Sequence, residues 1–266
     1  MSNDLARFLA GSPERRELLT HLRKQPGSPA ELADVLSLSR RSIQRHLGQF
    51  VERGWATKSG GTYRLTTIGD CIVDEHTTYL KALDRIETFG PFLRNLPDIE
   101  HSPDPRWLDG ASLVTVSPEN PQAPIHAYLE RVREFDSDHI RMISPVLSRL
   151  FHDVHAELAL DGVHTELVMA EDTIDRARSL NPTEFKIVVS VGVLDLYRYP
   201  NSLGFGLTLG DDQLLMGAYD SGGHLEACVH STDTEFLQWG EELFERYRGQ
   251  ADLIEPSFSL PFSLGP

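Results

Sequence analysis

Cysteine and long apolar runs are scarce in this chain of 266 residues, and each scarcity excludes a class of protein. The two cysteines, Cys71 and Cys228, lie far apart in sequence, which excludes a disulfide framework and a cysteine-based metal motif. No apolar run approaches the length of about 20 residues that a membrane-spanning helix needs. The first residues, MSNDLARFLAG, are polar and do not form a signal peptide. We therefore expect a cytoplasmic protein of a reducing compartment, with no contact to a membrane.

Lysine is also scarce, since only four of the 25 cationic residues are Lys, and the net charge is −15. An acidic, lysine-poor composition is typical of proteins from halophiles that accumulate salt. The other interpretation is an ordinary acidic protein from a genome that favours arginine. At molar salt, a Debye length of about 3 Å would weaken contacts to phosphates, so that base contacts and shape would matter more in binding nucleic acid.

The cationic residues are concentrated at the start of the chain. Residues 1–68 hold 11 Lys and Arg against six Asp and Glu, a net charge of +5, whereas residues 69–266 hold 14 against 34, a net charge of −20. A basic segment on an acidic protein is the charge distribution expected of a surface that binds nucleic acid.

The segment SRRSIQRHLGQFVERG, residues 39–54, predicts a helix with two different faces. Its apolar residues follow the spacing i, i+4, i+7 and i+8, and Arg41, Gln44, Arg45 and Gly48 occupy the opposite face. The apolar set is Ile43, Leu47, Phe50 and Val51. Ser39 is suited to begin this helix and Gly54 to end it. A charged helix face is most often only solvated, so the neighbouring elements decide the interpretation.

These neighbours predict a winged helix-turn-helix. Two Ser-Pro starts, at residues 12–13 and 28–29, introduce earlier helices, and the second carries a capping box with Glu31. After residue 54, two short β-forming runs surround a Ser-Gly-Gly turn at residues 59–61, which predicts a hairpin, or wing. The order is helix, helix, recognition helix and wing, and in this motif the recognition helix enters the major groove of duplex DNA.

The residue types in this segment suggest how DNA would be read. Arg pairs with guanine and Gln with adenine, so the base-reading candidates are Arg40, Arg41, Gln44 and Arg45. Short polar and cationic side chains hold phosphates, and the candidates for this role are Ser39, Ser42, Lys58, Thr62 and Arg64.

A long amphipathic helix follows the wing within residues 69–96. Its apolar stripe, which includes Ile72, Leu80, Leu83 and Ile86, is broader than a small winged helix can bury. We expect residues 68–96 to pack against the same segment of a second copy in a homodimer, which would place two recognition helices on two half-sites. The alternative is packing on the second domain.

The remainder predicts an α/β domain. Residues 97–110 are rich in Pro and Asp and are interpreted as a linker or as the edge of that domain. Strands and helices then alternate from residue 111, and residues 197–231 read as successive antiparallel strands, so the sheet is expected to be mixed. The predicted domains are therefore 1–68, 69–96, 97–110 and 111–266. A closing helix is expected over residues 233–254, and a strand at 185–190.

Motifs for catalysis and for cofactors are absent. The sequence holds no P-loop, no G-x-G-x-x-G before a helix, no H-E-x-x-H and no G-x-S-x-G, so no cofactor is expected. His152 and His155 lie at i and i+3 beside Asp153 and Glu157, a spacing that a metal could use, but a polar helix face with partly buried imidazoles is the favoured interpretation.

The segments HIRMISPVLSRLFHDVHAELALDGVHTELVMA and ACVHSTDTEFLQWGEELFERYRGQADLI, with the N-terminal elements, carry a family resemblance. The chain resembles archaeal TrmB-like winged-helix regulators, and more closely those with a methanogenesis-filament-type regulatory domain. The resemblance covers nearly the whole chain and implies a C-terminal domain similar to the phospholipase D fold. That fold's hydrolases use H-x-K pairs, and none of the four Lys has a His two residues before it. The resemblance therefore implies a sensor or oligomerisation domain and not an enzyme.

An effector would bind beyond the carboxyl ends of strands in such a sheet. The candidate residues at these ends are Ser144, Glu171, His230 and Ser231, and Tyr197, Arg198 and Tyr199 add stacking surface and a cation suited to an anionic or sugar-like effector. Alternatively, the tyrosines belong to the core and Arg198 pairs with a carboxylate. For the whole chain, the alternatives to a DNA-binding regulator are a protein–protein module or an enzyme with a degenerate winged helix, or an RNA-binding winged helix.

Overall fold

The computed structural model describes residues 2–97, 102–180, 182–183, 185 and 192–255. The chain divides into two compact units, Met1–Asp84 and Arg85–Pro266, which we describe separately. The finer division expected from the sequence, at residues 68, 96 and 110, stays a prediction.

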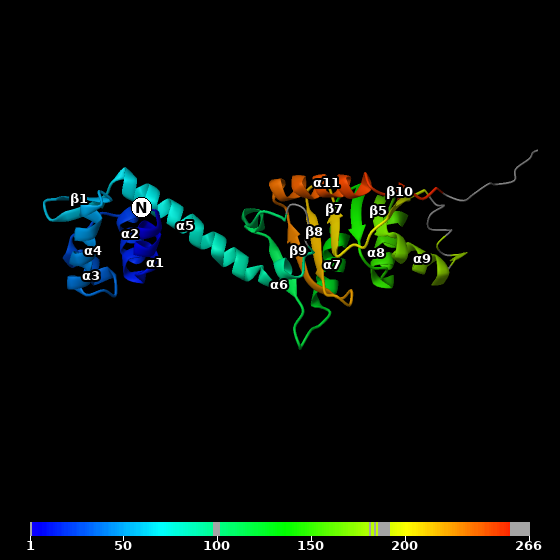
Figure 1. Cartoon of the computed structure of the whole chain (residues 1–266), viewed down its shortest axis with the longest axis horizontal. Coiled ribbons are helices and arrows are strands. Elements are labelled where there is room, and N and C mark those ends of the chain that lie inside the picture. Colours follow the sequence, from blue (N-terminus) through cyan, green and yellow to red (C-terminus); the bar gives the residue numbers. More distant parts are fainter. Residues whose placement is uncertain (1, 98–101, 181, 184, 186–191, 256–266) are drawn as a thin grey trace, which may run out of the picture. The chain divides into compact units, whose positions relative to one another are not determined.

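The first unit contains helices followed by a hairpin. Its helices are α1 (Ser2–Ala10), α2 (Pro13–Lys24), α3 (Pro29–Val35) and α4 (Arg40–Glu52), and β1 (Ala56–Ser59) pairs with β2 (Thr62–Leu65) in antiparallel register (Figure 1). The long helix α5 (Thr67–Thr88) begins directly after the hairpin. The order of α2, α3, α4 and the hairpin is the one that the sequence predicts, and α1 is an additional helix that the sequence analysis did not name.

Local signals in the sequence explain where these helices begin. Ser12, Ser28 and Ser39 each accept a hydrogen bond from a backbone N–H of the first turn, and the capping box with Glu31 is formed. The hairpin turn has positive φ at Gly60 (57°) and Gly61 (86°), which residues with a side chain rarely adopt.

One apolar core joins all elements of the first unit. Ile43, Leu47 and Phe50 of α4 are fully buried in it, and Trp55, Tyr63 and Val73 bring the hairpin and the start of α5 to the same core. Val51, expected on the buried face of α4, is instead 39 % exposed, and His46 is buried in its place. Positions 46 and 51 lie on the two flanks of the face formed by Ile43, Leu47 and Phe50, and the flank with position 46 is the one that meets Glu14 of α2.

The second unit is built on a mixed sheet, as predicted, and the described residues form eight strands in the order β10-β6-β5-β4-β7-β8-β9-β3. The strands are β3 (Ser112–Thr115), β4 (His139–Ser144), β5 (His164–Ala170), β6 (Leu194–Tyr199), β7 (Phe205–Leu209), β8 (Leu214–Tyr219), β9 (Leu225–Ser231) and β10 (Asp252–Leu253). Strands β4, β5 and β6 are parallel, and the other neighbouring pairs are antiparallel.

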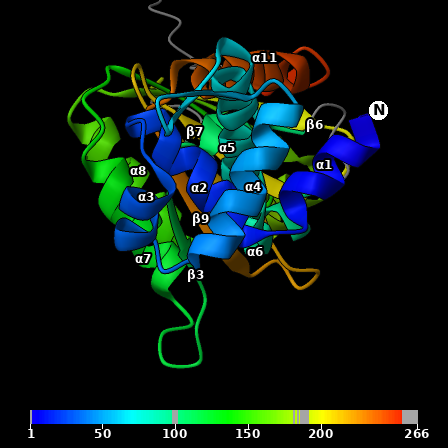
Figure 2. The same cartoon turned by 90° about the vertical axis from the view of Figure 1, so that its left-hand side faces the viewer.

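Helices cover both faces of this sheet. One face packs on α6 (Gly90–Arg94), on the 3₁₀ turn Pro105–Leu108 and on α11 (Thr234–Arg248), and the other face packs on α7 (Ala123–Arg133), α8 (Arg149–Leu160) and α9 (Glu171–Leu180). Figure 2 shows α7 and α8 on one side of the sheet and α6 on the other. Leu108, in the segment interpreted as a linker or domain edge, is buried in the core of this unit.

Two expected elements differ from the structure. The closing helix ends at Arg248 and not at Ile254, because the chain turns at Gly249 and adds β10 beside β6, at the edge of the sheet. Residues 194–199 form a strand parallel to β5, where the sequence suggested an antiparallel run from Tyr197. The strand expected at residues 185–190 lies almost entirely outside the described residues.

Candidate functional site

Helix α4 presents its cationic side chains to solvent. Arg40, Arg41, Gln44 and Arg45 are exposed, while the opposite face of the helix is buried in the core of the first unit. The side chain of Arg45 is 62 % exposed, and its guanidinium lies 4.0 Å from the Glu14 carboxylate, at the outer limit of an ion pair. Such an exposed pair contributes little, so Arg45 remains able to bind a ligand.

The start of α4 is held by its own serines. Ser39 Oγ accepts a hydrogen bond from the backbone N–H of Ser42 at 3.1 Å, and the two hydroxyls lie 3.2 Å apart. The first backbone N–H groups of a helix attract anions, so this end suits a phosphate. The capping role of Ser39 is one that the sequence predicted.

A buried histidine orients the exposed face of α4. His46 Nε2 lies 3.1 Å from Glu14 of α2 and 3.3 Å from the guanidinium of Arg45, and Nδ1 lies 3.4 Å from Gln49 Oε1. The sequence analysis did not single out this residue, although its i+3 spacing from Ile43 was the available signal.

The hairpin adds polar and cationic groups. Lys58, Thr62 and Arg64 are exposed, and the Lys58 ammonium lies 5.4 Å from the centre of the Tyr63 ring. Tyr63 also exchanges two backbone hydrogen bonds with Gly27, which ties the hairpin to the segment between α2 and α3.

The residues suggested for effector binding do not gather at one place. Ser144 and Glu171 lie at the carboxyl ends of β4 and β5, and Arg198 lies near the carboxyl end of β6. His230 and Ser231 end β9, which runs antiparallel to β4, so they lie at the opposite edge of the sheet. His230 and Ser231 therefore cannot share one binding site with Ser144 and Glu171.

The side chains on β6 and β9 have partners of their own. Arg198 pairs with Glu171 at 3.3 Å, and Tyr199 belongs to the core, where its ring lies 5.0 Å from that of Tyr247. Both contacts agree with the alternative interpretation of the sequence, in which the tyrosines belong to the core and Arg198 pairs with a carboxylate. His230 Nε2 lies 3.0 Å from Gln213 Oε1, and Ser231 Oγ accepts a hydrogen bond from the backbone N–H of Asp233 at 3.1 Å.

Tyr197 belongs to a buried ionic cluster around Glu166. The Tyr197 hydroxyl donates to Glu166 at 3.2 Å, the Arg248 guanidinium donates at 2.8 Å, and His139 Nε2 lies 3.2 Å away. Burial alone would raise the pKa of Glu166. The hydrogen bond and charge of Arg248, together with the Tyr197 hydrogen bond and the His139 charge, outweigh burial and lower this pKa. This cluster joins the end of α11 to the sheet.

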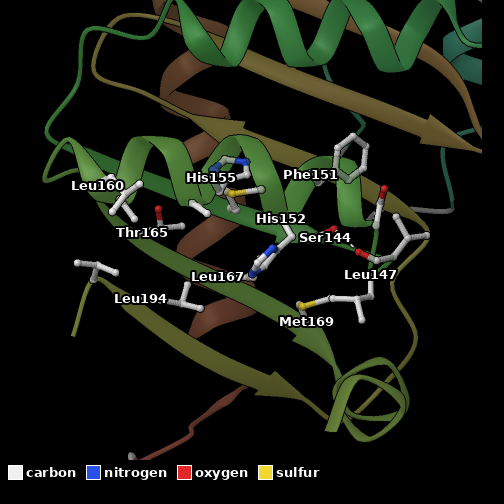
Figure 3. Close-up of a pocket in the computed structure, with 16 residues that line it drawn as sticks. Ser144, Leu147, Phe151, His152, His155, Leu160, Thr165, Leu167, Met169 and Leu194 are labelled. Atoms are coloured by element: carbon white, nitrogen blue, oxygen red, sulfur yellow. Dashed lines mark hydrogen bonds between the residues drawn. The ribbon is translucent and has the colours of Figure 1, made fainter. Parts of the chain in front are cut away.

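A cavity of about 340 Å³ lies between α8 and strands β4, β5 and β6 (Figure 3). Ser144 lines it, as do His152 and His155 of α8. His155 Nε2 lies 3.0 Å from the Tyr128 hydroxyl, which lies 3.0 Å from Thr208 Oγ1. Among the described residues, no group of His, Cys, Asp and Glu side chains is arranged to hold a metal ion.

Two family descriptions match the chain. Residues 121–250 match the family described as "Methanogenesis regulatory protein FilR1, middle domain", and residues 3–88 match the "HVO_A0261 N-terminal domain". No curated protein matches the sequence. No helix in the described parts of the chain is long and apolar enough to cross a membrane.

Similar solved structures share little sequence with this chain. TrmBL2, an archaeal chromatin protein, is 14 % identical over 86 % of this chain and 88 % of its own, with a TM-score of 0.44. The phospholipase D family member Nuc from Salmonella typhimurium is 13 % identical over 55 % of this chain and 99 % of its own, with a TM-score of 0.45. NucT from Helicobacter pylori is 10 % identical over 54 % and 98 %, with a TM-score of 0.44.

The helices and hairpin of the first unit lie within the region that matches the HVO_A0261 N-terminal domain, and most of the mixed sheet lies within the region that matches the FilR1 middle domain. The chain is therefore similar to the HVO_A0261 family over residues 3–88 and to the middle domain of the FilR1 regulatory protein over residues 121–250.

Proposed function

We propose that this chain is a winged helix-turn-helix transcriptional regulator that reads a specific duplex DNA sequence with α4. The observation that carries the proposal is the division of α4 into a buried apolar face and an exposed face with Arg40, Arg41, Gln44 and Arg45. The buried face fixes the helix on its unit, and the exposed face carries the side chains that pair with guanine and adenine in the major groove.

The hairpin and the helix start would fix the position of the protein on the duplex. Lys58, Thr62 and Arg64 are exposed on the two strands of the wing, where they can reach phosphates. The N-terminus of α4, where Ser39 accepts a hydrogen bond from the Ser42 N–H, would bind a phosphate. These contacts give affinity without sequence preference, so base specificity depends on the four side chains of α4.

Helix α5 would join two copies of the chain. Tyr79, Leu80, Leu83 and Ile86 are between 41 % and 59 % exposed and lie on one face of α5, at helical spacing. A row of large apolar side chains on a long helix is typical of an interface, and a homodimer would place two α4 helices on two half-sites.

The test is DNA binding by Arg41→Ala and Arg45→Ala, with Arg176→Ala as a control on an exposed arginine of α9. Binding is measured by fluorescence anisotropy at high salt, on duplex DNA from upstream of the protein's own gene and on random duplex. For the specific site, each α4 variant is expected to lose about 1–3 kcal/mol of binding free energy, with a smaller loss on random DNA. The Arg176 variant is expected to bind as the parent does.

Three outcomes would contradict this proposal. Equal losses on specific and random DNA would show that α4 does not read bases. No binding to any duplex by the folded protein would favour a protein–protein module or an enzyme with a degenerate winged helix, and preferential binding to RNA over duplex DNA would favour the RNA-binding alternative.

A further inference from the structure

The cavity beside α8 is almost entirely apolar. Of the 16 residues that line it, eleven are apolar, five are Ser, Thr or His, and none of these described residues is Asp, Glu, Lys or Arg. Its volume of about 340 Å³ is at the small end of the range of about 300–1,000 Å³ found for ligand pockets. Figure 3 shows the cavity between the side chains of α8 and those of the three parallel strands. The size and lining suit a small molecule with little polar surface.

One buried polar atom of a residue that lines this cavity has no partner among the described residues. His155 Nδ1 is buried and accepts or donates no hydrogen bond, whereas Nε2 of the same ring is engaged with Tyr128. Burial lowers the pKa of His155 to about 4, so the ring is neutral at neutral pH. A buried polar atom without a partner costs free energy, and a ligand that supplied the partner would recover it.

The chain of hydrogen bonds behind His155 fixes its ring. Tyr128 lies between His155 and Thr208, both at 3.0 Å, and Thr208 is 2 % exposed on β7. Because the Tyr128 hydroxyl has a single proton, the tautomer of His155 is linked to the direction of this chain, and Nδ1 can either donate or accept. The site therefore suits a hydroxyl, which can also do both.

We propose that this cavity binds a small, uncharged and largely apolar effector that carries one hydroxyl or a similar group, hydrogen-bonded to His155. A sugar would need more exposed polar surface than this lining presents, and an anion would need a Lys or Arg, which these described lining residues do not include. Arg198, the cation suggested by the sequence, is paired with Glu171 and does not line the cavity. A regulatory role for this ligand rests on the proposed function of the chain, whereas binding of the ligand does not.

The test uses a matched pair of probes with the full chain, 2-naphthol and naphthalene, with maltose and benzoate as polar and anionic comparisons. Isothermal titration calorimetry is expected to show one site for 2-naphthol, about fivefold weaker binding of naphthalene because one neutral hydrogen bond is lost, and no binding of maltose or benzoate. Binding of maltose or benzoate but not of 2-naphthol would overturn the proposal.

Variants locate the site. Ala159→Phe should fill the cavity from α8 and abolish binding of both probes, whereas Ala177→Phe, at an equally half-buried alanine of α9 that does not line the cavity, should leave both affinities unchanged. His155→Phe should reduce the affinity for 2-naphthol to that for naphthalene. Retained binding in a folded Ala159→Phe variant would place the probes elsewhere and overturn the proposal, as would an unchanged preference for 2-naphthol in His155→Phe.

DNA binding is measured separately, by the anisotropy assay above. If the protein binds the probes but does not bind DNA as proposed, only the DNA-binding proposal is contradicted. If it binds DNA but none of the probes, only the cavity proposal is overturned.

Discussion

The imidazole of His155 is held neutral by burial, with a smaller contribution from the neighbouring His152. A histidine in the unfolded chain has a pKa of about 6.5. Because the pKa of His155 in the folded protein is about 4, the unfolded state binds this proton more readily between the two values. The contribution of His155 to stability is therefore fully present above the unfolded pKa and is lost as the pH falls toward 4.

This gives a prediction for His155→Phe. The folded parent is expected to lose up to about 3 kcal/mol of unfolding free energy through this residue between pH 6.5 and pH 4, and the variant is expected to lack that part of the decline. Urea titrations of both proteins across this range measure the difference. Parallel stability curves for the two proteins would show that His155 titrates normally.

At the scale of the element, the join between the hairpin and α5 depends on one glycine. A Cβ on Gly69 would lie 2.1 Å from the backbone oxygen of Trp55, which cannot move without disturbing the hairpin, because it accepts the backbone N–H of Thr66. Gly69 is therefore required by the close approach of two backbones and not by an unusual φ.

Gly69→Ala is expected to destabilise the protein by about 1–3 kcal/mol, since the overpacked backbone has to shift. Gly48→Ala is the matched control, because Gly48 is also helical and nothing lies within 4 Å of its Cβ position. That control should be stabilised by about 0.5–1 kcal/mol through the better helix propensity of alanine. Thermal unfolding followed by circular dichroism distinguishes the two, and equal midpoints would refute this account of Gly69.

At the scale of the whole molecule, the proposed assembly depends on α5. The variant Leu80→Glu with Leu83→Glu adds two negative charges to the exposed apolar row and should convert the dimer to a monomer, because the carboxylates would be buried in the interface. Lys81→Glu makes the same change in net charge on the opposite side of the helix and should remain a dimer. Sedimentation equilibrium at high salt measures both, and a parent protein that is monomeric at all concentrations would contradict the interface.

Features with a local cause were predictable from the sequence. Such features depend on residues within a few positions of one another. Those present in the structure are the serine caps, the Gly-Gly turn, the buried spacing of Ile43, Leu47 and Phe50, and the alternation of strands and helices. The same local periodicity predicted that the arginines of α4 are exposed to solvent. The DNA-binding hypothesis was based on this prediction.

Features that depend on distant residues were decided only by the tertiary structure. Because of the direction of β9 in the sheet, His230 and Ser231 lie far from Ser144. Arg198, the cation that had suggested an anionic effector, forms an ion pair with Glu171. The cavity beside His155 exists because α8 packs across three strands without filling the space between them. Strand order, side-chain pairing and cavities arise from contacts between residues that are distant in sequence. The spacing of neighbouring residues does not encode such contacts.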